Sequence, residues 1–124
     1  MLLDTHALVW SALLPSSLSA RARDLISDPD NDRMVSTASA YEIEYKRRRD
    51  PELSRLPTDL DELRHLLVFE WLPIDEGHAT RAGRLPEHHR DPWDRIIVAQ
   101  ALAENLTLIS ADRALPIYGT RLEW

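Results

Sequence analysis

The alternation of short apolar segments with stretches of helical periodicity constrains the fold of this chain more than any other feature. Apolar segments at residues 1–3, 34–36, 68–72, 106–110 and 122–124 are predicted to be strands. Helices are predicted at 6–13, from Ser17 or Ser19 to about 27, and at 39–49, 60–67, 76–85 and 91–104. Short strands that alternate with helices are typical of an open α/β sheet. We therefore expect an α/β fold with a mostly parallel central sheet.

The last long helix has the clearest start. Asp91 is suited to cap it, Pro92 fits its first position, and Asp94 lies at its third. Asn105 is predicted to end it, in place of the more usual glycine. This pattern puts Asp94 in the first turn of a helix that leads into the strand at 106–110.

Length and composition limit the class of protein. The 124 residues fit one domain with a single core, residues 1–124. There are no cysteines, which removes disulfides, thiolate metal sites and cysteine nucleophiles. The longest apolar run falls far short of the roughly 20 residues that a transmembrane helix needs. The N-terminus has no positive segment, so we expect neither a membrane span nor a signal peptide.

The charge of the chain is negative. Its 21 acidic residues outnumber 15 basic ones, for a net charge of −6. This balance argues against a general nucleic-acid coat protein, which is usually basic. It leaves room for an enzyme that touches a few nucleotides and concentrates its acids in a metal pocket.

Acidic residues follow the predicted strands. Asp4 comes directly after the first strand, and Asp112 lies two residues beyond the strand that ends at Ser110. Glu42 lies in the first turns of the helix after the second strand, and Asp94 in the first turn described above. In a parallel sheet, sites form beyond the carboxyl ends of the strands. We therefore expect the four acids to point into one crevice.

Each acid also has a purely structural interpretation. Asp4 can cap the helix that follows it, and Asp112 can cap a turn. Asp94 can pair with the capping residue Asp91 and stabilise the helix dipole. These interpretations explain the acids singly, but four acids at one edge of a predicted sheet are harder to explain in this way.

Glu42 has two structural alternatives of its own. It lies three residues after Ser39, which is the spacing of a capping box. It also lies four residues before Lys46, which is the spacing of a helical ion pair.

The physics of clustered carboxylates favours a bound cation. Two carboxylates about 4 Å apart repel by roughly 4 kcal/mol at an effective dielectric constant near 20. A divalent ion removes that repulsion, and an all-oxygen site without cysteine suits Mg²⁺ or Mn²⁺. Such an ion orients water, increases its acidity and stabilises charge on a phosphodiester.

Four segments carry a resemblance to a known family. They are MLLDTHALVW at 1–10, STASAYEI at 36–43, HRDPWDRIIVAQA at 89–101 and LISAD at 108–112. Together they resemble the motifs of PIN-domain ribonuclease toxins of the VapC type, from VapBC toxin–antitoxin systems. Their order and spacing cover essentially the whole chain, and the third segment is the most specific.

The resemblance implies a PIN-like three-layer α/β/α domain over residues 1–124. It also implies a cytoplasmic endoribonuclease that depends on one or two Mg²⁺ or Mn²⁺ ions and hydrolyses RNA to a 5′-phosphate and a 3′-hydroxyl. The implied partners are an RNA substrate, a cognate VapB-type antitoxin and a second copy of the chain in a homodimer.

The acids at Asp4, Glu42, Asp94 and Asp112 match the acidic positions of this family. The resemblance implies that Asp4 and Asp94 bind the metal directly. Glu42 and Asp112 would be ligands, water-mediated ligands or acids behind the ligands. Asp91 lies nearby, and its predicted role is the helix cap.

The departures from the family pattern are modest. Tyr41 stands where Trp is common, and Trp93 where Phe is common. The stretch from Arg47 to Leu56 is more charged than expected, which leaves the shape of the groove entrance open.

Other functions fit less well. The main alternative is a non-catalytic PIN-like module that binds protein or RNA and keeps its acids for stability. A receiver-type phosphoacceptor domain needs a lysine after a late strand, and the only lysine, Lys46, lies mid-chain on a predicted helix. A phosphatase with an Asp-x-Asp nucleophile motif is excluded because His6 occupies the second Asp position.

Several basic residues have two interpretations. The run from Lys46 to Arg49 can contact RNA phosphates, but a solvated helix end is favoured. Arg95 is a candidate for phosphate contact or for an ion pair. Zinc binding by His88 and His89 is not expected, because adjacent residues rarely share one metal and no matching motif exists.

The remaining candidates are polar or aromatic. Thr5 and Ser110 can hydrogen-bond a carboxylate or a bound water, or can cap a helix and a strand end. The four tryptophans, at positions 10, 71, 93 and 124, are predicted to be core or interface residues.

Overall fold

The computed structural model describes every residue from Met1 to Trp124. The strands are β1 (Leu2–Leu3), β2 (Met34–Ser36), β3 (Glu70–Leu72), β4 (Leu108–Ile109) and β5 (Leu122–Glu123). The α-helices are α1 (Thr5–Leu13), α2 (Ala20–Ser27), α3 (Thr37–Arg47), α4 (Leu60–Leu67), α5 (Glu76–Arg84) and α6 (Pro92–Ala103). Short 3₁₀ helices span Pro15–Ser17 (η1), Leu53–Arg55 (η2) and Leu115–Tyr118 (η3). The predicted α/β class is confirmed.

The five strands form one sheet in the order β3-β2-β1-β4-β5, and all four pairings are parallel. The chain first builds outward from β1 through β2 to β3, and then returns to the other side of β1 to add β4 and β5. The strand order therefore reverses between β1 and β4. In open α/β sheets, the crevice at such a reversal, beyond the carboxyl ends of the strands, is where ligands bind.

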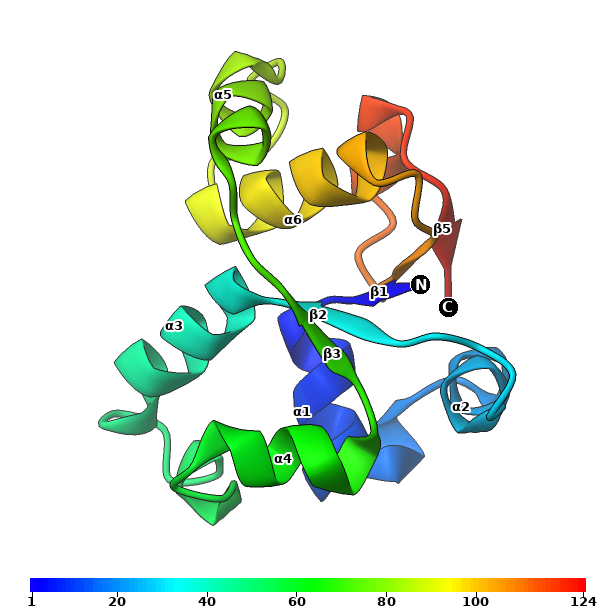
Figure 1. Cartoon of the computed structure of the whole chain (residues 1–124), viewed down its shortest axis with the longest axis vertical. Coiled ribbons are helices and arrows are strands. Elements are labelled where there is room, and N and C mark those ends of the chain that lie inside the picture. The colour runs from blue at the N-terminus through cyan, green and yellow to red at the C-terminus, as the bar shows by residue number, and fades with distance from the viewer.

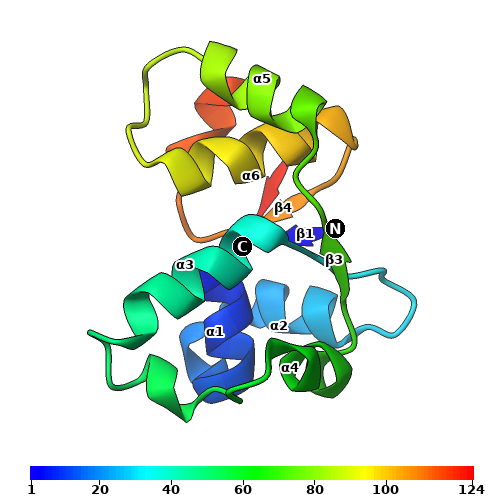
Figure 2. The ribbon, with the colours of Figure 1, turned by 60° about the vertical axis from the view of Figure 1, so that its left-hand side comes forward.

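Helices cover both faces of the sheet, which gives the expected three layers. Figures 1 and 2 show α5 and α6 on one face and α1, α2 and α4 on the other. The side chains of a strand point alternately to opposite faces. Leu3 accordingly packs with α1, α2 and α4, whereas its neighbour Leu2 packs with α6. Both leucines are buried, so the short strand β1 contributes to two cores.

The element boundaries differ from the sequence predictions by a few residues. Ser19, not Ser17, caps α2, and its hydroxyl accepts a hydrogen bond from Ala22 N. Helix α3 begins at Thr37, two residues earlier than predicted, because Ser36 caps it. Strand β3 begins at Glu70 rather than at residue 68, because Val68 closes α4 in a left-handed conformation with φ of 52°.

Two further predictions concern the ends of α6. Asp91 caps the helix by accepting a hydrogen bond from Trp93 N at 2.9 Å, as predicted. Asn105 follows the helix with φ of 54°, a conformation that asparagine tolerates better than most residues. None of the helices combines the length and the apolar character that crossing a lipid bilayer requires.

Candidate metal centre

The four predicted acids line one pocket at the carboxyl ends of the central strands. The pocket has a volume of about 300 Å³. Its lining residues are Asp4, Thr5, His6, Trp10, Glu42, Lys46, Asp91, Asp94, Ala111 and Asp112. The amino-terminal ends of α3 and α6 reach the same edge of the sheet as the start of α1 (Figure 1). The predicted meeting of four acids in one crevice is therefore confirmed.

Asp4 lies at the floor of the pocket and is 9% exposed. Its Oδ1 accepts a 2.7 Å hydrogen bond from Ala7 N, so this carboxylate caps α1. Burial raises the pKa of Asp4, while hydrogen bonds with the Ser110 hydroxyl and Ala7 N lower it in part. The cap and the pocket are compatible, because one carboxylate has two oxygens. The Ser110 hydroxyl also accepts a 3.1 Å hydrogen bond from Asp112 N, so it has both of its predicted roles, carboxylate contact and strand-end cap.

Glu42 is 6% exposed and also belongs to the pocket floor. Its Oε2 accepts a 2.6 Å hydrogen bond from Lys46 Nζ, so the predicted ion pair is confirmed. The capping-box interpretation is wrong, because Ser39 lies inside α3 rather than at its start. The hydroxyls of Ser39 and Thr5 lie 2.9 Å apart and join α3 to α1. This contact links the helix that carries Glu42 to the helix that Asp4 caps.

Asp94 lies at the rim of the pocket, and its side chain is 33% exposed. No main-chain group donates to its carboxylate, so the predicted capping pair with Asp91 does not form. Burial and the negative charges of Asp91, Glu42 and Asp4 raise the pKa of Asp94 to about 6, although His89 opposes the shift. The surroundings of Asp94 therefore disfavour its charged form, and no main-chain hydrogen bond compensates.

Asp112 completes the rim, and its side chain is 39% exposed. Its Oδ1 accepts a hydrogen bond from Ala114 N, which is the predicted turn cap. Its Oδ2 lies 3.1 Å from Nε2 of His89, and the same nitrogen lies 3.4 Å from Oδ2 of Asp94. One imidazole thus joins two of the predicted acids in a cluster that could hold a metal ion.

His89 was not among the predicted site residues. His88 and His89 do not act together, because the ring of His88 lies against Tyr118, 5.7 Å between centroids. The available signal was the position of His89, two residues before the cap of α6 in the most specific motif. Its partners are 5 and 23 positions away in the sequence, so spacing alone could not identify the cluster.

Arg95 does not form the predicted ion pair. Its guanidinium donates hydrogen bonds to the carbonyl oxygens of four residues, Ala82, Leu85, Pro86 and His89, at 2.7–3.2 Å. These bonds tie the end of α5 and the following loop to α6. Arg95 is therefore a positioning residue, because the loop that it holds carries His89.

The basic run at the end of α3 divides into different roles. Lys46 pairs with Glu42 in the pocket. Arg47 donates to the carbonyl oxygens of Leu53, Leu56 and Pro57 and is mostly buried. Arg48 and Arg49 line a second groove on α3. The favoured interpretation, a solvated helix end, is therefore wrong for Arg47, while the other three residues of the run are exposed.

The tryptophans pack against the two cores, as predicted. Trp10, Trp71 and Trp124 lie against the core under α1, α2 and α4, and Trp93 lies against the core under α6. Trp10 also lines the pocket, where it stands beside His6 at 5.4 Å between ring centroids.

The residues present fit a divalent cation. Five carboxylates line the pocket, with Asp91 as the fifth, and the imidazole of His89 contacts two of them at the rim. This donor set has no thiolate, which suits Mg²⁺ or Mn²⁺. Burial and the neighbouring negative charges raise the pKa of Asp94, and one positive ion between the carboxylates would offset their repulsion. Lys46 alone supplies only one positive charge, and it is bonded to Glu42.

Fold and site together describe a parallel α/β domain with an acidic pocket at the point where its strand order reverses. The family model for the PIN domain matches residues 1–119. The chain therefore belongs to the PIN domain family, and the resemblance drawn from its four motifs is confirmed at this level.

Three solved structures are similar in fold. A chain of the DNA-bound VapBC from Salmonella typhimurium aligns with a TM-score of 0.73 and 18% identity, over 98% of this chain and 95% of that one. A chain of VapBC2 from Rickettsia felis, bound to a DNA fragment from its promoter, gives 0.69 and 17%, over 99% and 98%. A toxin–antitoxin complex from Klebsiella pneumoniae gives 0.60 and 21%, over 90% and 85%. No curated protein matches the sequence significantly.

Proposed function

We propose that this protein is a metal-dependent endoribonuclease that acts as the toxin of a type II toxin–antitoxin system. Asp94 carries the proposal. Its carboxylate lies in the pocket among other acids, its pKa is raised to about 6, and it has no main-chain partner, which favours a ligand of positive charge at this position. Asp4 and Glu42 are buried in the same pocket and carry the same implication.

Asp4 and Asp94 would hold the metal ion, with Glu42, Asp112 and His89 as further ligands or as acceptors for its bound water. When bound, the ion would supply an activated water and stabilise negative charge on the phosphodiester. The chain itself supplies rigid placement. Ala7 N fixes Asp4, Lys46 Nζ fixes Glu42, and the His89 ring fixes Asp112.

The toxin role is inferred from the family motifs and from the kind of complex in which the similar folds occur. Two of the similar chains come from VapBC structures and a third from a toxin–antitoxin complex. By the same reasoning the partner of this chain would be a VapB-type antitoxin, and the chain would form a homodimer in the cytoplasm. We also propose that residues 1–124 act as a single domain.

Cleavage mapping on total RNA tests the proposal. Wild-type protein with Mn²⁺ should give new 5′-phosphate and 3′-hydroxyl ends, and removal of metal with EDTA should abolish them. Asp4→Ala, checked for its fold by circular dichroism, should give none. Folded wild-type protein that leaves RNA intact with Mn²⁺ and with Mg²⁺ would favour the second candidate, a PIN-like module that only binds.

A further inference from the structure

A row of exposed aromatic residues on α3 leads away from the pocket. The rings of Tyr41 and Tyr45 stack with an interplanar angle of 12° and 6.0 Å between centroids. The Arg49 guanidinium lies over the Tyr45 ring, 5.6 Å from its centroid. Trp93, from α6, touches the other end of the row, with 4.6 Å between its ring and that of Tyr41. We call these four residues the aromatic row.

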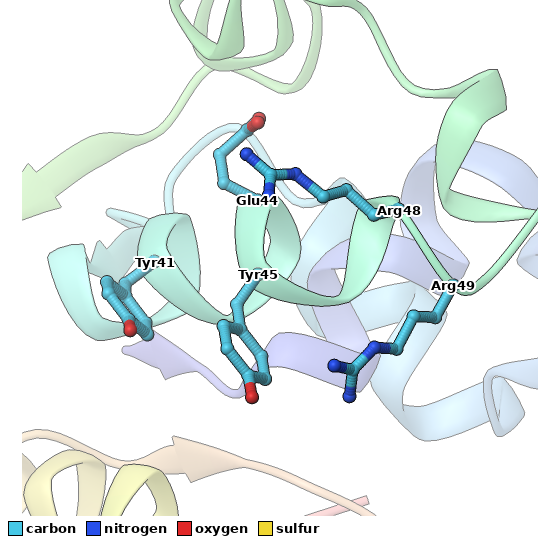
Figure 3. Close-up of a pocket in the computed structure, with 5 residues that line it drawn as sticks. All are labelled: Tyr41, Glu44, Tyr45, Arg48 and Arg49. Atoms are coloured by element: carbon cyan, nitrogen blue, oxygen red, sulfur yellow. The ribbon is translucent and has the colours of Figure 1, made fainter.

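The two tyrosines of the aromatic row lie on the surface, whereas Trp93 packs against the core under α6. Tyr41 is 54% exposed and Tyr45 55% exposed, although large aromatic side chains are usually covered. Figure 3 shows both rings and the Arg49 side chain directed to the same side of α3. They border a groove of about 290 Å³ that Glu44 and Arg48 also line.

The near end of the row adjoins the acidic pocket. Tyr41 directly precedes Glu42, and Trp93 directly precedes Asp94. In each pair, one residue lines the pocket and its neighbour joins the row. The near end of the row is therefore held next to the proposed metal ligands by both α3 and α6.

The charge along the row suits an anionic strand. Arg49 and Arg48 stand at its far end, on a protein with a net charge of −6. Glu44 is the one acid of the groove, and it pairs with Arg47 at 2.9 Å. Aromatic faces that stack with unpaired bases, together with cations for the phosphates, are the elements of single-stranded nucleic-acid binding sites.

We propose that the aromatic row binds unpaired bases of a single-stranded RNA segment and directs its backbone into the acidic pocket. This inference rests on the proposed ribonuclease function and names the surface that holds its substrate. From residue 41 to the end of α3 at residue 47 the helix advances about 9 Å, which matches about three stacked nucleotides. The row thus favours cleavage next to an unpaired stretch over cleavage within a duplex.

Binding without cleavage tests this inference. The probe is a fluorescein-labelled oligoadenylate of about 12 nucleotides, since stacking on aromatic rings tolerates any base. The protein carries Asp94→Asn and is kept in EDTA, so that RNA is not cut. Fluorescence anisotropy should show that Tyr45→Ala weakens binding by roughly 5- to 100-fold. Tyr45→Phe, which keeps the ring, should bind as the parent does.

Two matched controls separate stacking from general effects. Leu66→Ala removes an exposed apolar side chain on α4, 71% exposed, and should leave the affinity unchanged. Arg49→Ala should reduce the slope of log affinity against log salt by about one, because one phosphate contact is lost. Arg81→Ala removes an exposed charge from α5 and should leave that slope unchanged. The oligoadenylate annealed to its complement should bind more weakly than the single strand.

The inference is overturned if Tyr45→Ala binds RNA as the parent does, or if the parent binds no RNA. It is also overturned if Tyr45→Ala changes the molar mass in light scattering but not RNA binding, because the row would then be a self-association surface. If the wild type cleaves RNA and Tyr45→Ala binds RNA unchanged, the proposed role of the aromatic row is rejected and the nuclease function is kept. RNA binding along the row without any metal-dependent cleavage would instead reject the nuclease function.

Discussion

His89 Nε2 lies 3.1 Å from Asp112 Oδ2, and this contact joins the loop before α6 to the turn after β4. The same nitrogen faces Asp94 Oδ2 at 3.4 Å. An imidazole nitrogen among carboxylates favours Mn²⁺ over Mg²⁺, because Mg²⁺ prefers oxygen ligands only.

We predict that His89→Ala reduces the preference for Mn²⁺ over Mg²⁺. Isothermal titration should show a loss of Mn²⁺ affinity of about tenfold, the range found when ligand-supporting groups are removed, with little change for Mg²⁺. Electron spin echo spectroscopy of the Mn²⁺-loaded wild type should detect a ¹⁴N coupling that the variant lacks. Equal losses for both metals would mean that His89 only supports the fold of the loop.

Asp94 gives the metal-free protein a distinctive dependence on pH. Its pKa is raised from 3.8 to about 6 in the folded state, so the folded protein holds a proton more tightly than the unfolded chain does. The contribution of Asp94 to stability is therefore full below about pH 4 and is lost as the pH rises through 6. In EDTA, the melting temperature of the wild type should fall more between pH 5 and 7 than that of Asp94→Asn. Parallel curves for the two proteins would contradict the electrostatic account of the pocket.

The pair between Lys46 and Glu42 should stabilise the empty pocket and weaken metal binding. Lys46→Met leaves Glu42 buried without its cation, which we expect to lower the free energy of unfolding of the metal-free protein by about 1–3 kcal/mol. The uncompensated charge of Glu42 should in turn bind Mn²⁺ more tightly. The increase in melting temperature on adding Mn²⁺ should therefore be larger in Lys46→Met than in the wild type, and Lys46→Arg should resemble the wild type. A smaller increase in Lys46→Met would show that Lys46 supports the metal site.

Arg95 should matter for stability rather than for contact with RNA. Its guanidinium satisfies four carbonyl oxygens, so Arg95→Met should lower the free energy of unfolding by about 2–4 kcal/mol in urea denaturation. Arg81→Met, on an exposed face of α5, is the control and should have almost no effect. If Arg95→Met keeps full stability and loses only RNA affinity, the side chain contacts phosphate after all.

The architecture was predictable because the alternation of strands and helices and the cap of α6 depend on residues that are close together in the sequence. Asp4 directly follows one apolar strand and Asp112 lies within three residues of the end of another, so a parallel sheet was enough to place them together. The errors in the predicted element boundaries lay at the ends of helices and strands. Val68 has a β-branched side chain and a φ of 52°, a conformation that its residue type disfavours and that only the end of α4 explains.

The site was predictable to the extent that it consists of strand-end acids. His89 was missed because it lies on an irregular loop, and its position depends on hydrogen bonds from Arg95 across that loop. The aromatic row was missed for a different reason. Tyr41 and Tyr45 have the i, i+4 spacing of any helix face, and only their exposure distinguishes them from core residues.

A shared cation among the pocket acids is the central claim, and calorimetric titration of Mn²⁺ into metal-free protein tests it most directly. The wild type should show saturable binding and, at a free Mn²⁺ concentration of about 100 times the Kd, a stabilisation of about 2.7 kcal/mol. Asp94→Asn should remain folded and lose this binding, as should Asp4→Ala. A flat titration of wild-type protein up to millimolar Mn²⁺, or binding that survives in Asp94→Asn, would contradict the claim.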